Sequence, residues 1–154
     1  MRVFVEFNLG SLSLALPVED IGKVVSVDRV VRVPGAPGII KGVVELRGEV
    51  LPLVSLAEAL GVGADRGSGK VIVAHLNGMK VGLLVEGVKG ILRVREKDIL
   101  PLEGMGSSPA FSEVIRQGDG FVLVLRPDSL MQQGEKSEEE IMEELLALLG
   151  YGTR

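Results

Sequence analysis

The stretch KVIVAHLNGMKVGLLV at residues 70–85 places Asn77 and Gly78 between two aliphatic runs. A type I′ turn needs a positive φ angle at both of its central residues, and Asn-Gly adopts that geometry readily. Aliphatic and β-branched residues on either side favour extended backbone. The stretch therefore predicts an antiparallel hairpin, with strands at 70–76 and 79–85.

Similar patterns lie on both sides of this hairpin. Apolar runs around a short turn predict two more hairpins, one with strands at 3–9 and 12–16 and one with strands at 39–46 and 49–56. Further extended segments are expected at 23–33, 88–94, 97–102 and 121–126, and a short helical turn is expected at 111–117. Short strands at close spacing, with little helical periodicity, indicate an all-β barrel or sandwich.

The first half of the chain is also similar to the second. After a shift of 67 residues, residues 4–34 align with 71–101 without a gap. Identical residues then meet at Leu9/Leu76, Leu16/Leu83, Glu19/Glu86 and Pro34/Pro101. Such a register favours an internal duplication, although two hairpins of equal length also align by chance. A duplication implies two similar β-subdomains packed together, approximately residues 1–66 and 67–133, with a seam between them.

The composition excludes most kinds of catalytic site. Among 154 residues there is no Cys and one His, His75. Disulfides, Cys nucleophiles and zinc sites built on thiolates or several imidazoles are therefore excluded within one chain. His75 is expected at the surface of a strand. Glu19 and Glu86 occupy duplicated positions, where two carboxylates could form a catalytic pair; we expect them instead to cap matching turns. We expect no catalytic residue, no cofactor and no metal.

Charge divides the chain into a neutral body and an acidic tail. Residues 1–134 carry equal numbers of acidic and basic side chains, whereas residues 135–154 carry six acids, two bases and a net charge of −4. The body has no basic excess to attract nucleic acid. No apolar run is long enough for a membrane span, and the N-terminal residues lack the apolar region of a signal peptide. A cytoplasmic protein that binds neither nucleic acid nor a membrane is the simplest interpretation.

The tail is predicted to contain an amphipathic helix. Residues 134–137 are expected to be a short linker, in which Ser137 is predicted to form a capping box with Glu140 ahead of a helix at 138–150. Apolar residues recur there at helical spacing and form a broad face. That face either covers the protein's own barrel or belongs to a detachable element that binds a partner. Deletion of residues 135–154 separates these alternatives through its effect on the melting temperature.

Several ordered motifs resemble the CheW-like family of chemotaxis adaptors. They are FNLG at 7–10, VPGAPGIIKGVVELRGEVLPLVSL at 33–56, KVIVAHLNGMKVGLLVEGVKGIL at 70–92 and GDGFVLVL at 118–125. The resemblance implies two packed and interleaved SH3-like, five-stranded β-barrels within residues 1–133. It also implies a non-enzymatic adaptor. Such an adaptor links the regulatory domain of a CheA-type histidine kinase to the cytoplasmic tips of methyl-accepting chemoreceptors.

The resemblance also implies a protein-interaction surface. Its residues, carried over by position, are Ile21, Lys23, Val24, Glu45, Arg47, Gly48 and Val88. Three residues depart from the family pattern: Lys23 stands where Glu is frequent, Glu45 where Asn is usual, and Ser55 where Asp is usual. Because a reversed charge at a contact changes partner choice, a scaffold of a divergent chemosensory pathway is one alternative. A small ligand-binding β-barrel, with a deep pocket at the seam, is the other.

Overall fold

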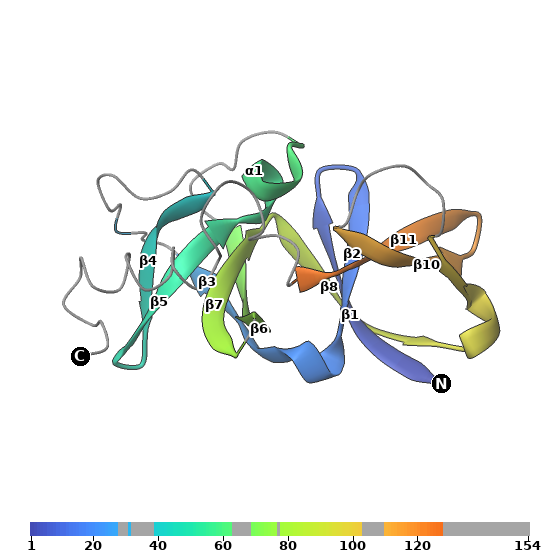
Figure 1. Ribbon diagram of the computed structural model, residues 1–154, viewed down its shortest axis with the longest axis horizontal. Coiled ribbons are helices and arrows are strands. Elements are labelled where there is room, and N and C mark those ends of the chain that lie inside the picture. The colour runs from blue at the N-terminus through green and yellow to red at the C-terminus, as the bar shows by residue number, and fades with distance from the viewer. Residues whose placement is uncertain (28–30, 32–38, 63–68, 77, 103–109, 128–154) are drawn as a thin grey trace.

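Figure 1 shows a computed structural model of the protein, which describes residues 1–27, 31, 39–62, 69–76, 78–102 and 110–127. The predicted linker at 134–137 and the predicted helix at 138–150 lie outside the described residues. The described elements are β1 (Arg2–Leu9), β2 (Leu12–Pro17), η1 (Val18–Asp20), β3 (Ile21–Val27), β4 (Ile40–Leu46), β5 (Glu49–Ser55), α1 (Leu56–Leu60), β6 (Gly69–Leu76), β7 (Met79–Val85), β8 (Gly87–Val94), η2 (Glu96–Asp98), β9 (Ile99–Pro101), β10 (Phe111–Gln117) and β11 (Gly120–Leu125).

The strands form two sheets, which lie beside each other along the long axis of the molecule (Figure 1). One sheet has six strands in the order β8-β1-β2-β11-β10-β9, and the other has five in the order β3-β6-β7-β5-β4. The sixth strand, β9, has only three residues. The predicted all-β fold with two β-subdomains is therefore confirmed.

The register of the strands confirms the internal duplication. A shift of 67 residues carries β1 onto β6 residue for residue, and carries β2 and β3 onto β7 and β8 to within one residue. Equivalent strands hold equivalent places in the two sheets. Both sheets also contain a β-bulge at the same position. Since a bulge is a specific feature of a fold and not a defect, its repetition supports the duplication. The matching pairs around the bulges are Ile21–Ala74 and Lys23–Val73 in one sheet, and Val88–Phe7 and Gly90–Glu6 in the other.

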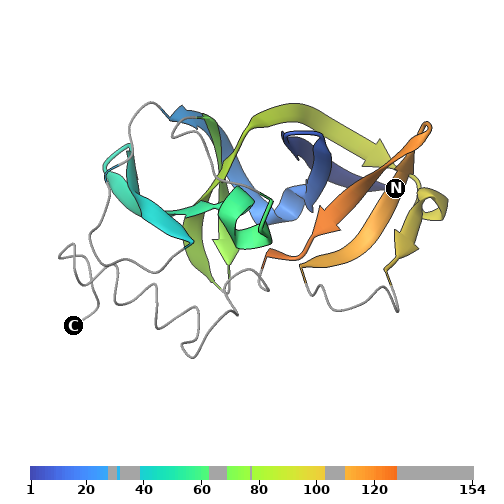
Figure 2. The same ribbon diagram turned by 90° about the horizontal axis from the view of Figure 1, so that it is seen from above.

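Each sheet takes strands from both halves of the chain. β3 follows the hairpin β1–β2 but pairs with β6, and β8 follows the hairpin β6–β7 but pairs with β1. Figure 2 shows the yellow-green strand β8 passing from one unit to the other. Residues 21–85 therefore build the five-stranded sheet. The predicted boundary near residue 66 does not separate the two sheets in space.

Two segments differ from their predicted structure. Residues 111–117 form strand β10 between β9 and β11, where a helical turn was expected. Phe111, Val114 and Ile115 have helical spacing, but hydrogen bonding to two neighbouring strands outweighs that local preference. In the predicted extended segment 97–102, the first two residues belong to the 3₁₀ turn η2, and the strand begins at Ile99.

Buried apolar side chains form three clusters. One lies within the five-stranded sheet and contains Leu53 and Val71, and a second lies within the six-stranded sheet and contains Phe4. The third, which we call the central cluster, contains residues of both sheets, among them Phe7 and Leu83. The two sheets are therefore joined by a shared apolar core, whose burial is the dominant favourable term in folding.

An ion pair ties two distant strands of the six-stranded sheet. Nη1 of Arg2 on β1 donates to both carboxylate oxygens of Glu113 on β10, at 3.0 and 2.9 Å. This hydrogen bond raises the pKa of Arg2 above its usual value. The guanidinium carbon also lies 5.0 Å from the ring centroid of Phe4, within the range of a cation–π contact. Since β1 and β10 are not neighbours in the sheet, the pair links two strands that share no backbone hydrogen bonds.

Candidate protein-interaction surface

Ile21 on β3 and Val88 on β8 occupy the two equivalent bulges. Both side chains are half-buried, and both pack against the central cluster that joins the sheets. Farther along, each strand exposes an aliphatic side chain at the duplicated position: Val24 is 39% exposed and Ile91 is 55% exposed. The β3 surface and the β8 surface thus share one pattern, a half-buried apolar residue followed by an exposed aliphatic one.

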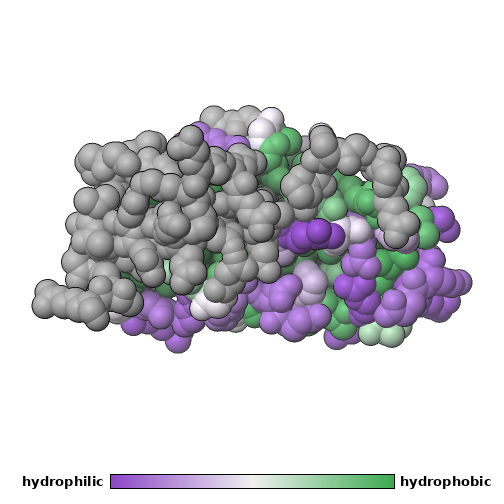
Figure 3. Space-filling model, in the orientation of Figure 1, coloured by the Kyte–Doolittle hydropathy of each residue, from purple (hydrophilic) through white to green (hydrophobic). Residues whose placement is uncertain are grey.

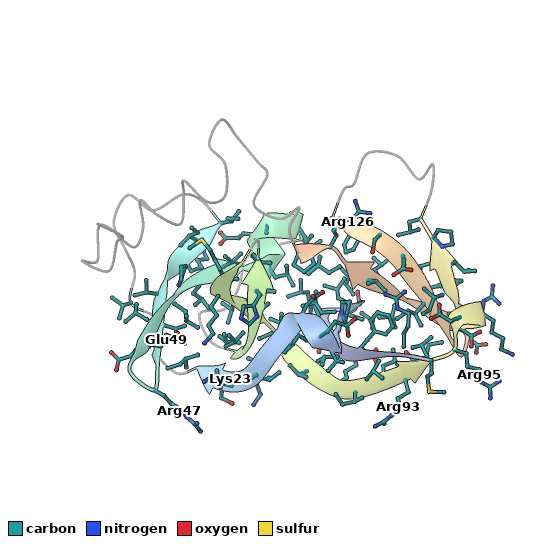
Figure 4. All side chains as sticks on the ribbon, turned by 60° about the horizontal axis from the view of Figure 1, so that its bottom comes forward. Lys23, Arg47, Glu49, Arg93, Arg95 and Arg126 are labelled. Atoms are coloured by element: carbon teal, nitrogen blue, oxygen red, sulfur yellow. The ribbon has the colours of Figure 1, made fainter. Side chains whose placement is uncertain are left out.

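Charge distinguishes the two surfaces. On β3, Lys23 is exposed and makes no ion pair or hydrogen bond with side chains in the described part of the chain. On β8 the equivalent position is Gly90, and its neighbour Lys89 lies 3.6 Å from Glu6. Figure 4 shows Lys23 on β3 and Arg93 farther along β8. The β3 surface therefore offers a free cation beside its apolar residues, which favours an acidic partner.

Arg47 and Gly48 form the two-residue turn between β4 and β5. Their φ angles are 49° and 80°, as a type I′ turn requires. Among the described residues, Arg47 is the one non-glycine residue with a positive φ angle. Figure 4 shows its side chain pointing away from the tip of the hairpin. Such a conformation costs an L-residue roughly 1–2 kcal/mol. The stability of the turn therefore does not account for an arginine at position 47.

The predicted interaction residues fall into two groups. Ile21, Lys23 and Val24 lie together on β3, with Val88 at the equivalent bulge of β8, whereas the hairpin tip carries Glu45, Arg47 and Gly48, all three exposed. Glu49, at the start of β5, pairs with Lys80 on β7 at 3.1 Å. Ile91 is not among the predicted interaction residues, although the 67-residue alignment pairs it with Val24. That alignment is the signal that identifies it.

Ser55 lies inside the protein and is the N-cap of α1. Its side chain is fully buried, and its hydroxyl oxygen accepts a hydrogen bond from the backbone N–H of Glu58 at 3.3 Å. Serine and aspartate are both preferred N-cap residues, because each offers a side-chain oxygen to an unpaired N–H of the first turn. The departure from Asp at this position therefore keeps a capping group and does not reach the surface.

Replacement of Ser55 tests this structural role. Ser55→Ala is expected to lower the free energy of unfolding by about 1 kcal/mol, because the N–H of Glu58 loses its partner. Ser55→Asp is expected to keep most of the stability. Urea denaturation followed by circular dichroism measures both. A Ser55→Ala variant as stable as the parent protein would show that the cap does not contribute.

Other candidate side chains have ordinary roles. His75 is exposed on β6. The carboxylate of Glu86 accepts a hydrogen bond from the backbone N–H of Gly10 at 2.8 Å, so it caps the turn between β1 and β2. The described residues contain no group of three or more His, Asp or Glu side chains that could hold a metal ion. In the same part of the chain, no helix has the length and hydropathy of a membrane span.

The surface is mixed in hydropathy. On the face drawn in Figure 3, hydrophobic side chains are visible over the six-stranded sheet, and hydrophilic side chains line the lower edge. Protein interfaces are on the whole about as apolar as other surfaces. Hydropathy alone therefore does not identify an interaction surface, and the equivalent positions on β3 and β8 remain the candidate.

The chain is similar in sequence and fold to known proteins. The chain is 35% identical over 94 residues to the chemotaxis protein CheW of Thermotoga maritima, an alignment that covers 60% of this chain and 62% of that protein. It is 32% identical to the chemotaxis protein CheW of Rhizobium meliloti, over 69% of this chain and 70% of that protein. The crystal structure of the scaffolding protein TtCheW from Thermoanaerobacter tengcongensis has a similar fold, with a TM-score of 0.79 at 24% identity, covering 88% of this chain and 96% of that one. Residues 3–135 match the family model of the CheW-like domain, and the chain belongs to that family.

Proposed function

We propose that this protein is a chemotaxis adaptor that couples the cytoplasmic tips of chemoreceptors to a CheA-type histidine kinase. One observation carries the proposal: in a member of the CheW-like family, β3 and β8 expose equivalent apolar surfaces after the same bulge. Two such surfaces allow one small protein to contact two larger ones. The adaptor acts by binding, without a reaction of its own, and it works in the cytoplasm because the receptor tips lie there.

The contacts follow from the chemistry of each surface. A receptor tip is a helical hairpin, and the apolar face of a helix binds in a groove through residues spaced three or four apart. Ile21 and Val24 supply apolar contacts for such a face, and Lys23 pairs with acidic residues at its rim. The exposed guanidinium of Arg47 offers five donors in a planar fork, which suits a carboxylate.

The alternative is a scaffold of a divergent chemosensory pathway, and Lys23 favours it. Its positive charge reverses the Glu that is frequent at this position, and a partner must match that reversal. Affinity purification of the tagged protein from its native cytoplasm tests both proposals. Recovery of a chemoreceptor with a CheA-type kinase supports the first, recovery of a kinase with a different class of sensor supports the second, and recovery of neither kinase nor sensor contradicts both.

Arg47 provides a test that separates binding from stability. Asn tolerates a positive φ angle better than Arg, so Arg47→Asn is expected to leave the melting temperature unchanged or to raise it slightly. Affinity for receptor-tip and kinase fragments is expected to fall about tenfold, as for loss of a moderate hot-spot residue. Calorimetric titration and thermal unfolding measure the two effects. Unchanged affinity for both fragments would show that Arg47 is not a contact residue.

A further inference from the structure

A hollow lined in part by three arginine residues lies at one end of the six-stranded sheet. It has a volume of about 320 Å³ and lies between the end of β8 and the turn that joins β10 to β11. Arg93, Arg95 and Arg116 contribute to its wall, Asp98 is the one acidic side chain that does so, and Leu92 and Ile115 are among its apolar residues. We call it the arginine pocket.

The three arginines lie at the same end of the sheet: Arg93 is on β8, Arg95 directly follows β8, and Arg116 is on β10. Arg93 and Arg95 stand two residues apart, on either side of the buried Val94, so they lie on one face of extended backbone. Arg116 is near the end of β10. Figure 4 shows Arg93 and Arg95 pointing away from the ribbon near the end of β8.

None of these arginines has a partner in the described part of the chain. All three are exposed, and within the described residues no ion pair, side-chain hydrogen bond or ring contact involves them. Arg2, which lies on the same sheet, is by contrast fully engaged by Glu113. Three arginines and one carboxylate residue line the arginine pocket, and guanidinium groups suit an anion with several negative charges.

We propose that the arginine pocket binds the acidic tail of the same chain, through Glu138, Glu139 and Glu140 and their neighbours. The tail, residues 135–154, carries six acids and accounts for the whole net charge of −4. The negative charge of the tail is therefore complementary to the positive charge of the arginine pocket. This inference does not depend on the proposed adaptor function.

The length of the chain permits this contact. The last described residue, Pro127, follows β11, and the six residues of β11 span about 20 Å back toward the arginine pocket. The ten residues 128–137 reach up to about 35 Å when extended. The first glutamates of the tail can therefore reach Arg93, Arg95 and Arg116 of their own chain.

Docking within one chain is favoured over docking between chains. Exposed ion pairs are individually weak, so a few of them bind poorly between separate molecules. A covalent connection of about ten residues supplies an effective concentration in the millimolar range, which is enough to populate a weak contact. The contact is also expected to weaken as ionic strength rises, because exposed charges are screened.

Paramagnetic relaxation in the full-length protein tests the inference. The chain contains no Cys, so Gly134→Cys provides a single site for a spin label at the start of the tail. We expect the label to broaden the amide signals of Arg95 and Gln117 at low salt. The triple variant Arg93→Gln, Arg95→Gln, Arg116→Gln should reduce the docked population about tenfold, since each pair contributes roughly twofold or more.

A matched variant controls for the loss of charge. A second triple variant removes three exposed cations from the five-stranded sheet through the substitutions Lys23→Gln, Arg47→Gln and Lys70→Gln. It should keep the broadening at the arginine pocket. The inference would be overturned if the spin-labelled Gly134→Cys protein showed no broadening at the arginine pocket. It would also be overturned if the broadening persisted after the three arginines were replaced by Gln. A mixture of isotope-labelled chains with spin-labelled, isotope-free chains reports contacts between copies. Broadening in that mixture would overturn docking within one chain and assign the tail to a second copy.

Discussion

A variant carrying Ile21→Glu and Arg47→Ala is expected to bind receptor-tip and kinase fragments at least 30-fold more weakly than the parent protein. Ile21 is half-buried at the edge of the central cluster, so a carboxylate at this position must lose water when a partner binds. Arg47→Ala removes an exposed planar cation of the kind that is enriched among hot spots. Two losses of about 1–2 kcal/mol each correspond to a 30-fold or larger change in affinity.

Two controls separate a lost contact from a damaged fold. Val62→Glu places the same charge at an apolar residue that is 49% exposed, after α1 and away from β3 and β8, and it should bind normally. Ile21→Thr keeps a β-branched side chain at the bulge and should retain more binding than Ile21→Glu. Calorimetric titration with each fragment, together with melting temperatures, gives the comparison. Parental affinity of the double variant for both fragments would remove β3 and the hairpin tip from the contact surface.

The hairpins and the duplication could be predicted because their signals are local. Asn77-Gly78 and Arg47-Gly48 mark turns, and alternation marks the strands beside them. The exchange of β3 and β8 between hairpins could not be predicted in the same way. The apolar pattern of β3 is compatible with pairing to β2 or to β6, and no residue in it specifies which hairpin it joins.

The errors also have a physical cause. Phe111, Val114 and Ile115 have the spacing of a helix, yet β9 and β11 supply hydrogen-bond partners on both sides of that segment. The interaction residues implied by the family resemblance could be placed by position, but the bulges beside Ile21 and Val88 could not be predicted from the apolar pattern. Ile91 became recognisable as a candidate only when both its duplication with Val24 and its exposure were known.

Gly82→Val is expected to lower the free energy of unfolding by about 3 kcal/mol, as overpacking of a well-packed core does. Gly82 lies on β7 inside the five-stranded sheet, where a Cβ atom would stand 2.8 Å from Cγ1 of Val71 and 3.3 Å from Cδ1 of Leu53. At the equivalent place in the other sheet, the fully buried residue is Ala15. A loss of this size lowers the melting temperature by roughly 6–12 °C in a protein of this length.

Two further comparisons identify the cause of the destabilisation expected for Gly82→Val. Gly22→Val adds the same side chain at an exposed strand glycine, where a Cβ atom meets its nearest neighbour at 3.7 Å, an ordinary contact distance, and it should change stability by less than about 0.5 kcal/mol. If contact with Val71 causes the destabilisation, Val71→Ala should create room for a methyl group at residue 82. The double variant Gly82→Ala, Val71→Ala should then be about 1 kcal/mol more stable than the sum of the single effects. Simple additivity would contradict this packing and would attribute the cost of the substitution to the backbone of β7.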